Sequence, residues 1–478
     1  MSLQTTIKSL QDILRKDPGV DGDAQRIGQL VWMLFLKVLD DREEERELSD
    51  KKYRPTLPEE LRWRAWAATP EGITGDELLK FVNDDLFPRL QGLPPRTPLA
   101  KVVRSVFEDA INYMKSGHLM RQVLNKLSEI NLNRSADQHE IGGIYEQILS
   151  DLRGAGNAGE FYTPRGVTEF MVDRIQPRLG ETLLDPACGT GGFLVCAIER
   201  LRDQAKDDED RRTIERSIHG IEKKALPHLL CVTNLLLHQM DAPTQVVHDN
   251  ALRKAVDQYT EKDEVDIILT NPPFGGMEED GIEKNFPRFQ TRETADLFLV
   301  LILARLRDGG RAGIVLPDGT LFGEGIKTRL KEKVLTECNL HTIVRLPKGV
   351  FAPYTSIKTN LLFFTKGEPT KTVWYYEHPY PAGSKSYSKT KPLRFDEFKP
   401  ERAWWDDRKE TDQAWPVSIE TIRERGFNLD LKNPRAPDDG PGDAEELLRE
   451  YHEAAAEAAK LRDQLKEELR AALMGGRA

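Results

Sequence analysis

The sequence predicts an α/β protein whose central sheet is preceded by a helical region and followed by a helical tail. From about residue 155, short apolar strands alternate with helical segments, which is typical of a parallel sheet flanked by helices. Before that point, apolar side chains recur at helical spacing. After residue 443, a segment rich in Ala, Glu and Leu follows a linker of Pro, Gly and Asp. We therefore expect three domains, at residues 1–150, 151–432 and 433–478.

The N-terminal region reads as a bundle of helices. "IKSLQDILRK" carries Ile7, Leu10, Ile13 and Leu14 on one helical face. The next segment, "AQRIGQLVWMLFLKVLDDREEE", has Asp21 or Asp23 available as its N-cap. The region holds neither a glycine-rich phosphate loop nor a catalytic grouping. We interpret it as a packing or docking domain.

Seven apolar segments in the middle of the chain are expected to form strands of one parallel sheet. In such sheets, ligands bind beyond the carboxyl ends of the strands, so polar residues at strand ends are candidate site residues. The charged stretch 203–216 is expected to be a solvated helix or loop, and 276–296 a surface insertion. Beyond residue 370 the pattern is less regular. The predicted strands are "ETLLDPA", "SIHGIEK", "TQVVHDN", "VDIILTNPP", "GRAGIVLPDG", "LHTIVRLPKG" and "NLLFFTKG".

The C-terminal tail carries a heptad pattern. Its apolar residues step by four and three in alternation, and such a seam requires a partner helix. The partner is either the body of this chain or another subunit. We favour another subunit because the linker separates the tail from the sheet. The seam residues are Leu447, Tyr451, Ala454, Ala458, Leu461 and Leu465.

Composition indicates a globular protein outside the membrane. Of 478 residues, 39% are hydrophobic and 31% charged, and no apolar run approaches the roughly 20 residues that span a bilayer. The N-terminus lacks the basic and apolar layout of a signal peptide. We expect a cytoplasmic protein with no membrane partner.

Charge and cysteine content narrow the function further. The net charge is −10, whereas a protein that grips nucleic acid alone is usually basic somewhere. If nucleic acid is bound, a separate DNA-reading partner is therefore plausible. The four cysteines show no CxxC spacing and predict neither zinc nor a disulfide framework. We expect small buried thiols in a reducing compartment.

A glycine-rich turn follows the first predicted strand. "LLDPACGTGGFL" ends its strand at Asp185, and Gly189, Gly191 and Gly192 lead into a helix. Glycines let a backbone approach a ligand closely. A lone GxG is weak evidence for a nucleotide, but Asp-Pro-x-Cys-Gly-Thr-Gly is much more specific. The motif lacks the Gly-Lys-Ser/Thr of a triphosphate loop, which disfavours ATP.

Acidic residues end the next two strands. Glu222 in "GIEKK" is placed to accept hydrogen bonds from two ribose hydroxyls. In "VVHDNAL", Asp249 could accept from an adenine amino group with help from Asn250. The alternative is that Asp249 and Asn250 simply form a turn.

Together these motifs resemble a known family. "DPACGTGGFL", "GIEKK", "HDNAL" and "NPPFGG", in this order, resemble the adenine-N6 DNA methyltransferases that use S-adenosylmethionine. Upstream, "GEFYTPRGV" is similar to the family's cofactor motif, and its position indicates the γ order. The helical N-terminus and separate tail fit the methylation (M) subunit of type I restriction-modification systems. The resemblance implies a Rossmann-like methyltransferase sheet.

The resemblance also implies roles for individual residues. The segment before the glycine turn borders the methionine end of the cofactor, and the turn lies beneath it. Glu222 then holds the ribose, and Asp249 with Asn250 the adenine. The implied cofactor-binding residues before and in the turn are Glu160, Phe161, Tyr162, Thr163, Pro164, Arg165, Asp185, Gly189, Thr190, Gly191 and Gly192.

The Asn-Pro-Pro-Phe motif carries the expected chemistry. An adenine amino group is a poor nucleophile, and two acceptors aimed at its N–H bonds stabilise the charge that develops there. The Asn271 side-chain oxygen and the Pro272 carbonyl can supply them, and Pro273 stiffens the turn. Phe274 offers a stacking face to a base flipped out of the duplex. Phe351 or Tyr354 in "FAPYTSIKTNLLFF" could stack on the opposite face; we favour Tyr354. No metal is expected.

The resemblance implies partners as well. Sequence specificity would come from a specificity subunit, with two methylation subunits to one specificity subunit, and an ATP-dependent restriction subunit would join them. The substrate would be double-stranded DNA. Two alternatives remain: methylation of a protein glutamine amide, and a catalytically silent scaffold.

Overall fold

The computed structural model consists of two compact units, residues 1–431 and 432–478. In the part of the chain that it describes, no helix has both the length and the apolar character needed to cross a membrane. The described residues are 3–130, 145, 162–381, 383–384, 386–388, 390–435, 448, 451–452, 455–456 and 458–466.

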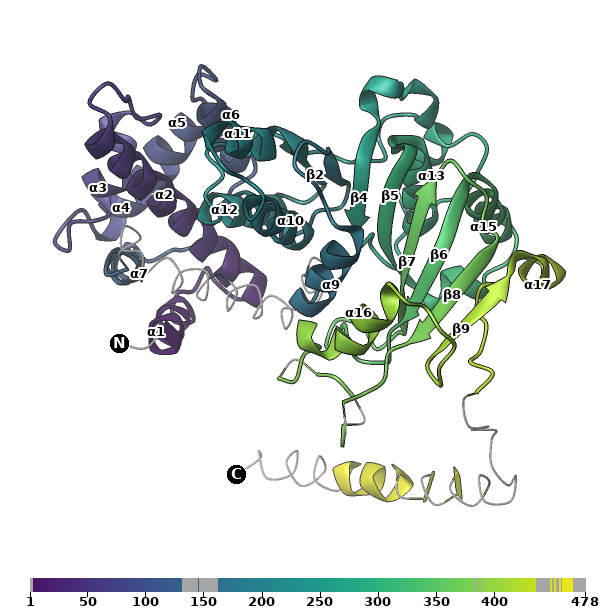
Figure 1. The fold of residues 1–478 in the computed structure, drawn as a ribbon. Helices are drawn as coiled ribbons and strands as arrows, with labels where there is room; N and C mark the ends of the chain where they lie inside the picture. Colours follow the sequence, from purple (N-terminus) through teal and green to yellow (C-terminus); the bar gives the residue numbers. More distant parts are fainter. Residues whose placement is uncertain are drawn as a thin grey trace. The chain divides into compact units, whose positions relative to one another are not determined.

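Within residues 3–130 every regular element is helical, as predicted (Figure 1). The long helix α2 is buried over most of its length from Ile27 to Leu39, so other helices pack around it. Its N-terminus is not capped by Asp21 or Asp23. Gln25 Oε1 instead accepts hydrogen bonds from the backbone N–H groups of Asp21 (2.7 Å) and Gly22 (3.2 Å). The elements are α1 (Leu3–Leu14), α2 (Asp23–Ser49), α3 (Trp63–Trp66), α4 (Gly75–Lys80), the π-helix η2 (Phe81–Leu86), α5 (Phe87–Gln91), α6 (Pro98–Phe107) and α7 (Gly117–Ser128).

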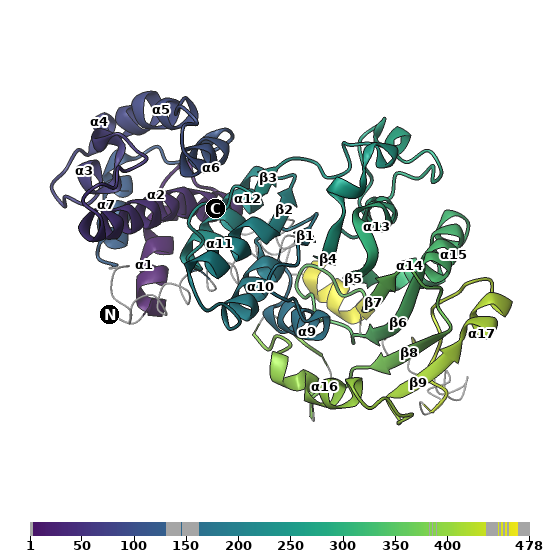
Figure 2. The same cartoon turned by 45° about the horizontal axis from the view of Figure 1, so that its top comes forward.

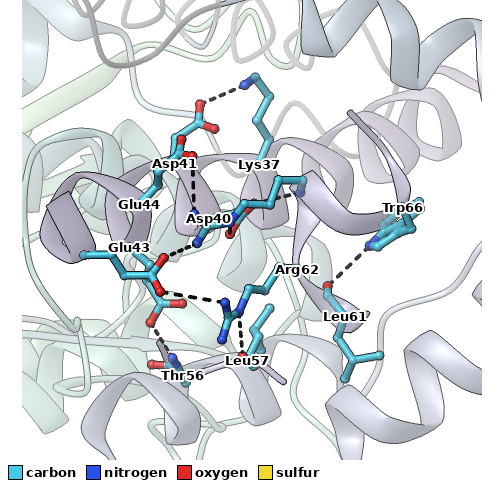
Figure 3. Close-up of polar contacts among 12 residues, drawn as sticks. Lys37, Asp40, Asp41, Glu43, Glu44, Thr56, Leu57, Leu61, Arg62 and Trp66 are labelled. Carbon is cyan, nitrogen blue, oxygen red and sulfur yellow. Dashed lines mark hydrogen bonds and ion pairs between the residues drawn. The ribbon is translucent and has the colours of Figure 1, made fainter. Parts of the chain in front are cut away.

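Buried carboxylates on α2 attach the following loop to this helix (Figure 3). Glu43, only 1% exposed, accepts hydrogen bonds from the Thr56 backbone N–H (2.7 Å) and the Tyr53 hydroxyl (2.9 Å). One turn earlier, Asp40 accepts from the Arg64 backbone N–H at 2.8 Å. Burial raises the pKa of Asp40, because desolvation disfavours its ionised form. Residues 53–64 therefore depend on α2 for part of their backbone hydrogen bonding.

Residues 183–418 contribute a nine-stranded sheet, in the order β3-β2-β1-β4-β5-β7-β6-β8-β9. The five strands from β3 to β5 run parallel. All seven predicted strands are present. The strands are β1 (Leu183–Asp185), β2 (Ile218–Glu222), β3 (Val246–His248), β4 (Val265–Thr270), β5 (Leu306–Pro317), β6 (Cys338–Arg345), β7 (Thr359–Lys366), β8 (Thr372–Glu377) and β9 (Ala414–Ser418).

The sheet is mixed, so the prediction of a parallel sheet was wrong for its second half. Strand β7 enters between β5 and β6 and runs antiparallel to both, and β9 runs antiparallel to β8. β7 follows β6 without an intervening helix, and an antiparallel neighbour needs no crossover helix. The region beyond residue 370 also contains more regular structure than expected, because β8, β9 and α16 lie there.

Alternating side chains bury both faces of the sheet. In β4, Ile267 and Leu269 join one core and Ile268 joins the other, and Phe363 and Phe364 of β7 divide in the same way. The first face packs against α9, α10 and α12, and the second against α13 and α15 (Figures 1 and 2). The remaining helices are α9 (Arg165–Ile175), α10 (Gly192–Arg202), α11 (Asp208–Ser217), α12 (Ala225–Leu237), α13 (Thr294–Arg305), α14 (Asp318–Phe322), α15 (Ile326–Glu337), α16 (Lys399–Trp405) and α17 (Ile419–Glu424).

The N-terminal helices and the sheet belong to one compact unit and share one core. Helix α2 packs on α12 (Figure 2). Beside this contact, the Arg42 guanidinium donates to the Leu236 carbonyl (3.0 Å) and the Met240 carbonyl (2.6 Å). The Leu236 carbonyl lies in the last turn of α12, the end of a helix that favours positive charge, and Met240 lies three residues beyond the helix.

Three smaller predictions can also be compared with the structure. The charged stretch 203–216 contains the solvated helix α11. All four cysteines are buried and free. In the tail, Tyr451, Leu461 and Leu465 are more than half exposed within this single chain. Leu447 and Ala454 of the predicted seam lie outside the described residues.

We predict that Glu43→Ala lowers the free energy of unfolding by about 2–4 kcal/mol, because two half-buried donors lose their acceptor and the buried carboxylate leaves a cavity. Urea denaturation followed by tryptophan fluorescence measures the change. Glu44→Ala is the matched control. The Glu44 side chain is 45% exposed and pairs with Arg64 at 3.3 Å, so its loss should cost less than about 1 kcal/mol. Equal losses in the two variants would contradict this prediction.

Candidate active site

Four polar side chains come together at the carboxyl edge of the parallel strands. Asp185 ends β1, Glu222 ends β2, Asp249 follows β3, and Asn271 follows β4. Because β1 pairs in parallel with both β2 and β4, these chain ends meet at one edge. They line a cavity of about 340 Å³. The predicted site residues that line it are Thr163, Asp185, Gly189, Thr190, Gly192, Glu222, Asp249, Asn250, Asn271 and Pro273.

The glycine turn forms the floor of the cavity and leads into α10. Gly191 has φ +82, and a Cβ there would meet Cys231 Sγ at 2.8 Å. Both conformation and space therefore require glycine at this position. The Thr190 carbonyl accepts a hydrogen bond from Asn234 Nδ2 at 3.0 Å, which attaches the turn to α12. A rigid floor of this kind lets a ligand lie close to the backbone.

Glu222 connects the turn to the second strand. Its carboxylate is buried and accepts hydrogen bonds from the backbone N–H groups of Gly189 (3.0 Å) and Lys224 (2.7 Å). The side chain therefore has a structural role in addition to the ribose contact expected from the sequence. A carboxylate has about four acceptor positions, so the two roles are compatible.

Asp185 is the most deeply buried carboxyl of the site, at 1% exposure. Desolvation raises its pKa to about 7. Its Oδ1 atom accepts a hydrogen bond from the Ala187 backbone N–H at 3.1 Å, which stabilises the bend after β1.

Asp249 and Asn250 support both interpretations left open by the sequence. Asp249 Oδ1 accepts from the Asn250 backbone N–H (2.7 Å) and pairs with Arg253 (2.5 Å), as in a turn. Asn250 Oδ1 accepts from the Leu252 backbone N–H at 2.9 Å. Both residues also line the cavity, so the turn is compatible with a binding role, which stays a prediction.

One wall of the cavity was not predicted. Glu278, 8% exposed, comes from the segment interpreted as a surface insertion. Its carboxylate contacts Lys223 Nζ (3.1 Å), Thr294 Oγ1 (3.3 Å) and Asn250 Nδ2 (3.4 Å). In the sequence, this contact could have been inferred only from an acidic run shortly after the NPPF motif and a basic pair directly after Glu222. Neither feature is specific, because the sequence does not tell which segments lie side by side in the fold.

The NPPF motif presents an unpaired acceptor. Asn271 Nδ2 donates to Thr163 Oγ1 at 3.0 Å. Asn271 Oδ1 is buried and accepts no hydrogen bond from any residue that the structure describes. Pro272 is buried and Pro273 exposed. A buried acceptor without a partner costs stability, and beside a cavity such an atom is a candidate acceptor for a hydrogen bond from a ligand.

Phe274 of this motif packs against Phe351, one of the two candidate stacking residues named from the sequence. Phe274 contacts Phe351 edge to face, with ring centroids 5.9 Å apart and planes at 73°. Phe351 is 5% exposed, and Tyr354 is half-buried. The structure therefore brings Phe351 against Phe274, and the stacking role of Tyr354 stays a prediction.

The upstream motif reaches the cavity through Thr163. Glu160 and Phe161 lie outside the described residues. Tyr162, Thr163 and Pro164 precede α9, and Arg165 is its first residue. Arg165 pairs with Glu169 (2.9 Å) and Glu199 (2.5 Å) on the helices. It is not among the residues that line the cavity.

We predict that Asp185→Asn changes the pH dependence of stability. The pKa of Asp185 is about 7 in the folded protein, against an ordinary value of 3.8. Between these values the folded state binds more protons than the unfolded state, so the stability of the wild type falls as pH rises. The asparagine side chain of the variant does not titrate, so it makes no such contribution to the pH dependence of stability.

Urea titrations from pH 4 to pH 8 measure the effect. The wild-type free energy of unfolding should fall relative to that of the variant between about pH 4 and pH 7, and the difference should then level off. Asp257→Asn, at an exposed position, is the control. A difference between wild type and Asp185→Asn that is independent of pH would refute the prediction.

Comparison with known proteins agrees with this geometry. Residues 136–440 match the model of the N-6 DNA Methylase family, and residues 3–127 match the HsdM N-terminal domain. The chain is 59% identical over 489 aligned residues to the Escherichia coli type I restriction enzyme EcoEI methylase subunit, covering 100% of this chain and 99% of the relative.

Solved structures show the same architecture. The modification subunit assigned to a type I restriction enzyme of Vibrio vulnificus is 45% identical, with a TM-score of 0.81 over 91% of this chain and 97% of that one. A chain from a study of complex assembly in a type I restriction-modification system is 36% identical, with a TM-score of 0.80 over 98% of each chain. The protein therefore belongs to the N-6 DNA methylase family, in the branch of type I restriction-enzyme methylase subunits.

Proposed function

We propose that this chain transfers a methyl group from S-adenosylmethionine to N6 of a flipped-out adenine in double-stranded DNA, at the cavity beyond β1, β2, β3 and β4. The observation that carries the proposal is the buried, unpaired Asn271 Oδ1 atom, on a residue that lines the same cavity as Glu222 and the glycine turn. Family membership supports the reaction class. The residue roles below are our assignment.

The cavity fits the cofactor in size and in donor set. Its volume of about 340 Å³ lies within the range of small-molecule sites. Glu222 would hold the ribose hydroxyls, Asp249 and Asn250 the adenine, and the glycine turn would lie beneath the methionine part. When bound, S-adenosylmethionine supplies an electrophilic methyl group on a sulfonium sulfur.

Asn271 and Pro272 would activate the target amino group. Each presents a carbonyl oxygen that accepts one of the two N–H bonds, which favours a tetrahedral nitrogen and stabilises its developing positive charge. The acceptors need little reorganisation because the two prolines restrict the turn. A strong general base is unnecessary, since the proton can leave after transfer.

Phe274 would stack on the extruded base. Stacking on an aromatic side chain contributes about 1–3 kcal/mol per base, and flipping costs a few kcal/mol. Phe351 supports the Phe274 ring at its edge. We assign it a packing role beside the base pocket.

Partner subunits would supply sequence specificity and restriction. A related chain was solved in a study of complex assembly, and a tail with exposed Tyr451, Leu461 and Leu465 supports a helical contact. We propose two methylation subunits on one specificity subunit, joined by an ATP-dependent restriction subunit. The three domains, 1–150, 151–432 and 433–478, would serve packing, catalysis and subunit contact.

We predict that Asn271→Ala abolishes methyl transfer while leaving cofactor binding nearly unchanged. Loss of one aimed acceptor in a water-excluded site lowers rates by about 10²–10³-fold. Tritiated methyl transfer to DNA, with the specificity subunit present, measures activity, and calorimetry measures cofactor affinity. Asn125→Ala on α7 is the control. It removes an amide that donates to the Pro70 carbonyl and should leave both quantities intact.

The same assay decides between the alternatives. Label on a protein glutamine in place of DNA would favour the amide methyltransferase. A wild-type complex that binds DNA and labels nothing would favour the scaffold. Either outcome would overturn the proposal.

We predict that replacing the seam residues weakens binding to the specificity subunit. Leu461→Ser with Leu465→Ser should lower affinity at least about tenfold, because two buried leucines contribute more than the 1.4 kcal/mol that a tenfold change requires. Lys460→Ser with Asp463→Ser, adjacent but off the seam, should have little effect. Affinity is measured by interferometry on the full chain. Equal effects of the two pairs would exclude the heptad contact.

A further inference from the structure

A hydrogen bond joins two cavity residues that are far apart in the sequence. Asn271 Nδ2 donates to Thr163 Oγ1 at 3.0 Å, across a separation of 108 residues. Thr163 lies just before α9 and Asn271 just after β4, and both line the cavity. Thr163 was expected to border the cofactor, and this contact points to a further task for its hydroxyl.

The hydrogen-bond partner of Asn271 Nδ2 determines the direction in which Asn271 Oδ1 points. A primary amide carries two donors on one side and an acceptor on the other. With Nδ2 bound to Thr163, Oδ1 lies on the opposite side, buried and without a partner among the described residues. Rotating the amide by half a turn would exchange the two and present N–H groups to an amino group, which also carries N–H groups. Only the observed orientation offers an acceptor there.

The support for Thr163 is rigid. Helix α9, which follows it, is anchored by Phe170, whose ring stacks on Phe398 at 4.1 Å with planes at 8°. At Gly166, an added Cβ would lie 2.7 Å from the Leu393 carbonyl, so the helix passes very close to that backbone. A side chain held by such packing can position another accurately.

We propose that Thr163 is a positioning residue for methyl transfer: its hydroxyl holds the Asn271 amide in the orientation that aims Oδ1 at the target amino group. The inference rests on the proposed function. On this inference, the Thr163 hydroxyl raises the rate of methyl transfer, and other residues determine the affinity for the cofactor.

The first test compares two substitutions of similar size. Thr163→Val removes the hydroxyl and should lower the single-turnover rate of methyl transfer about tenfold, which corresponds to the loss of one hydrogen bond. The cofactor dissociation constant should change less than about twofold, since the bond is made to Asn271. Thr163→Ser keeps the hydroxyl and should recover most of the rate.

Thr168→Val is the matched control. The buried Thr168 hydroxyl lies on α9, the helix that follows Thr163. It donates to the Arg165 carbonyl at 2.9 Å and accepts from Cys196 Sγ at 3.2 Å, and Thr168 is not among the residues that line the cavity. A slow Thr163→Val with a normal Thr168→Val supports the proposal. An unchanged rate in Thr163→Val, or a loss confined to cofactor affinity, overturns it.

A second test uses Asn271→Asp as background. A carboxylate presents an acceptor in either orientation, so adding Thr163→Val to this background should change its residual rate less than about threefold, against about tenfold in the wild-type background. The same fold-loss in both backgrounds would indicate a merely structural role and refute the inference.

The two proposals fail in different ways. If the wild type labels no DNA, the proposed function fails. Thr163 is then tested by the fluorescence of 2-aminopurine placed next to the target adenine, which should show weaker flipping of that adenine by Thr163→Val than by Thr163→Ser. If the wild type labels DNA and Thr163→Val does so equally fast, only the inference about Thr163 fails.

Discussion

The parallel pairing of β1 with β2 and β4 is the constraint on which the site depends. It brings three chain ends to one edge of the sheet, so that Asp185, Glu222 and Asn271 line one cavity. Glu222 stabilises this arrangement, because it accepts hydrogen bonds from the Gly189 backbone N–H in the glycine turn and from the Lys224 backbone N–H after β2. If β1 did not lie between β2 and β4, the glycine turn would lose the Glu222 carboxylate as its acceptor, and Asn271 would lie far from the turn.

The site contains buried polar groups of a kind that is rare in a purely structural core. Asp185 is buried with a raised pKa, and Asn271 Oδ1 is buried without a partner among the described residues. Both features reduce stability. Packing on both faces of the sheet holds these groups in place. Under the proposed function, an acceptor that is already desolvated would need little reorganisation when the substrate donor arrives.

Much of the molecule could be predicted from local patterns. Short apolar segments alternating with helical ones identified β1 to β7, and helical spacing identified α1 and α2. Charged and aromatic segments were harder. Strands β8 and β9 are rich in tryptophan and tyrosine without clear alternation, and the pairing of Lys223 with Glu278 joins residues 55 positions apart. Their proximity depends on the path of the whole insertion, which no short window of sequence specifies.

The sequence by itself determined which chemistry the protein can perform. The glycine turn, the acidic strand ends and the Asn-Pro-Pro-Phe motif are short, and their meaning depends on residue type and order. Only the tertiary structure decided the direction of β7, the choice of Phe351 beside Phe274, and the bond between Thr163 and Asn271. Strand pairing and core packing set these contacts, because they bring together residues whose separation along the chain carries no information about their distance in space.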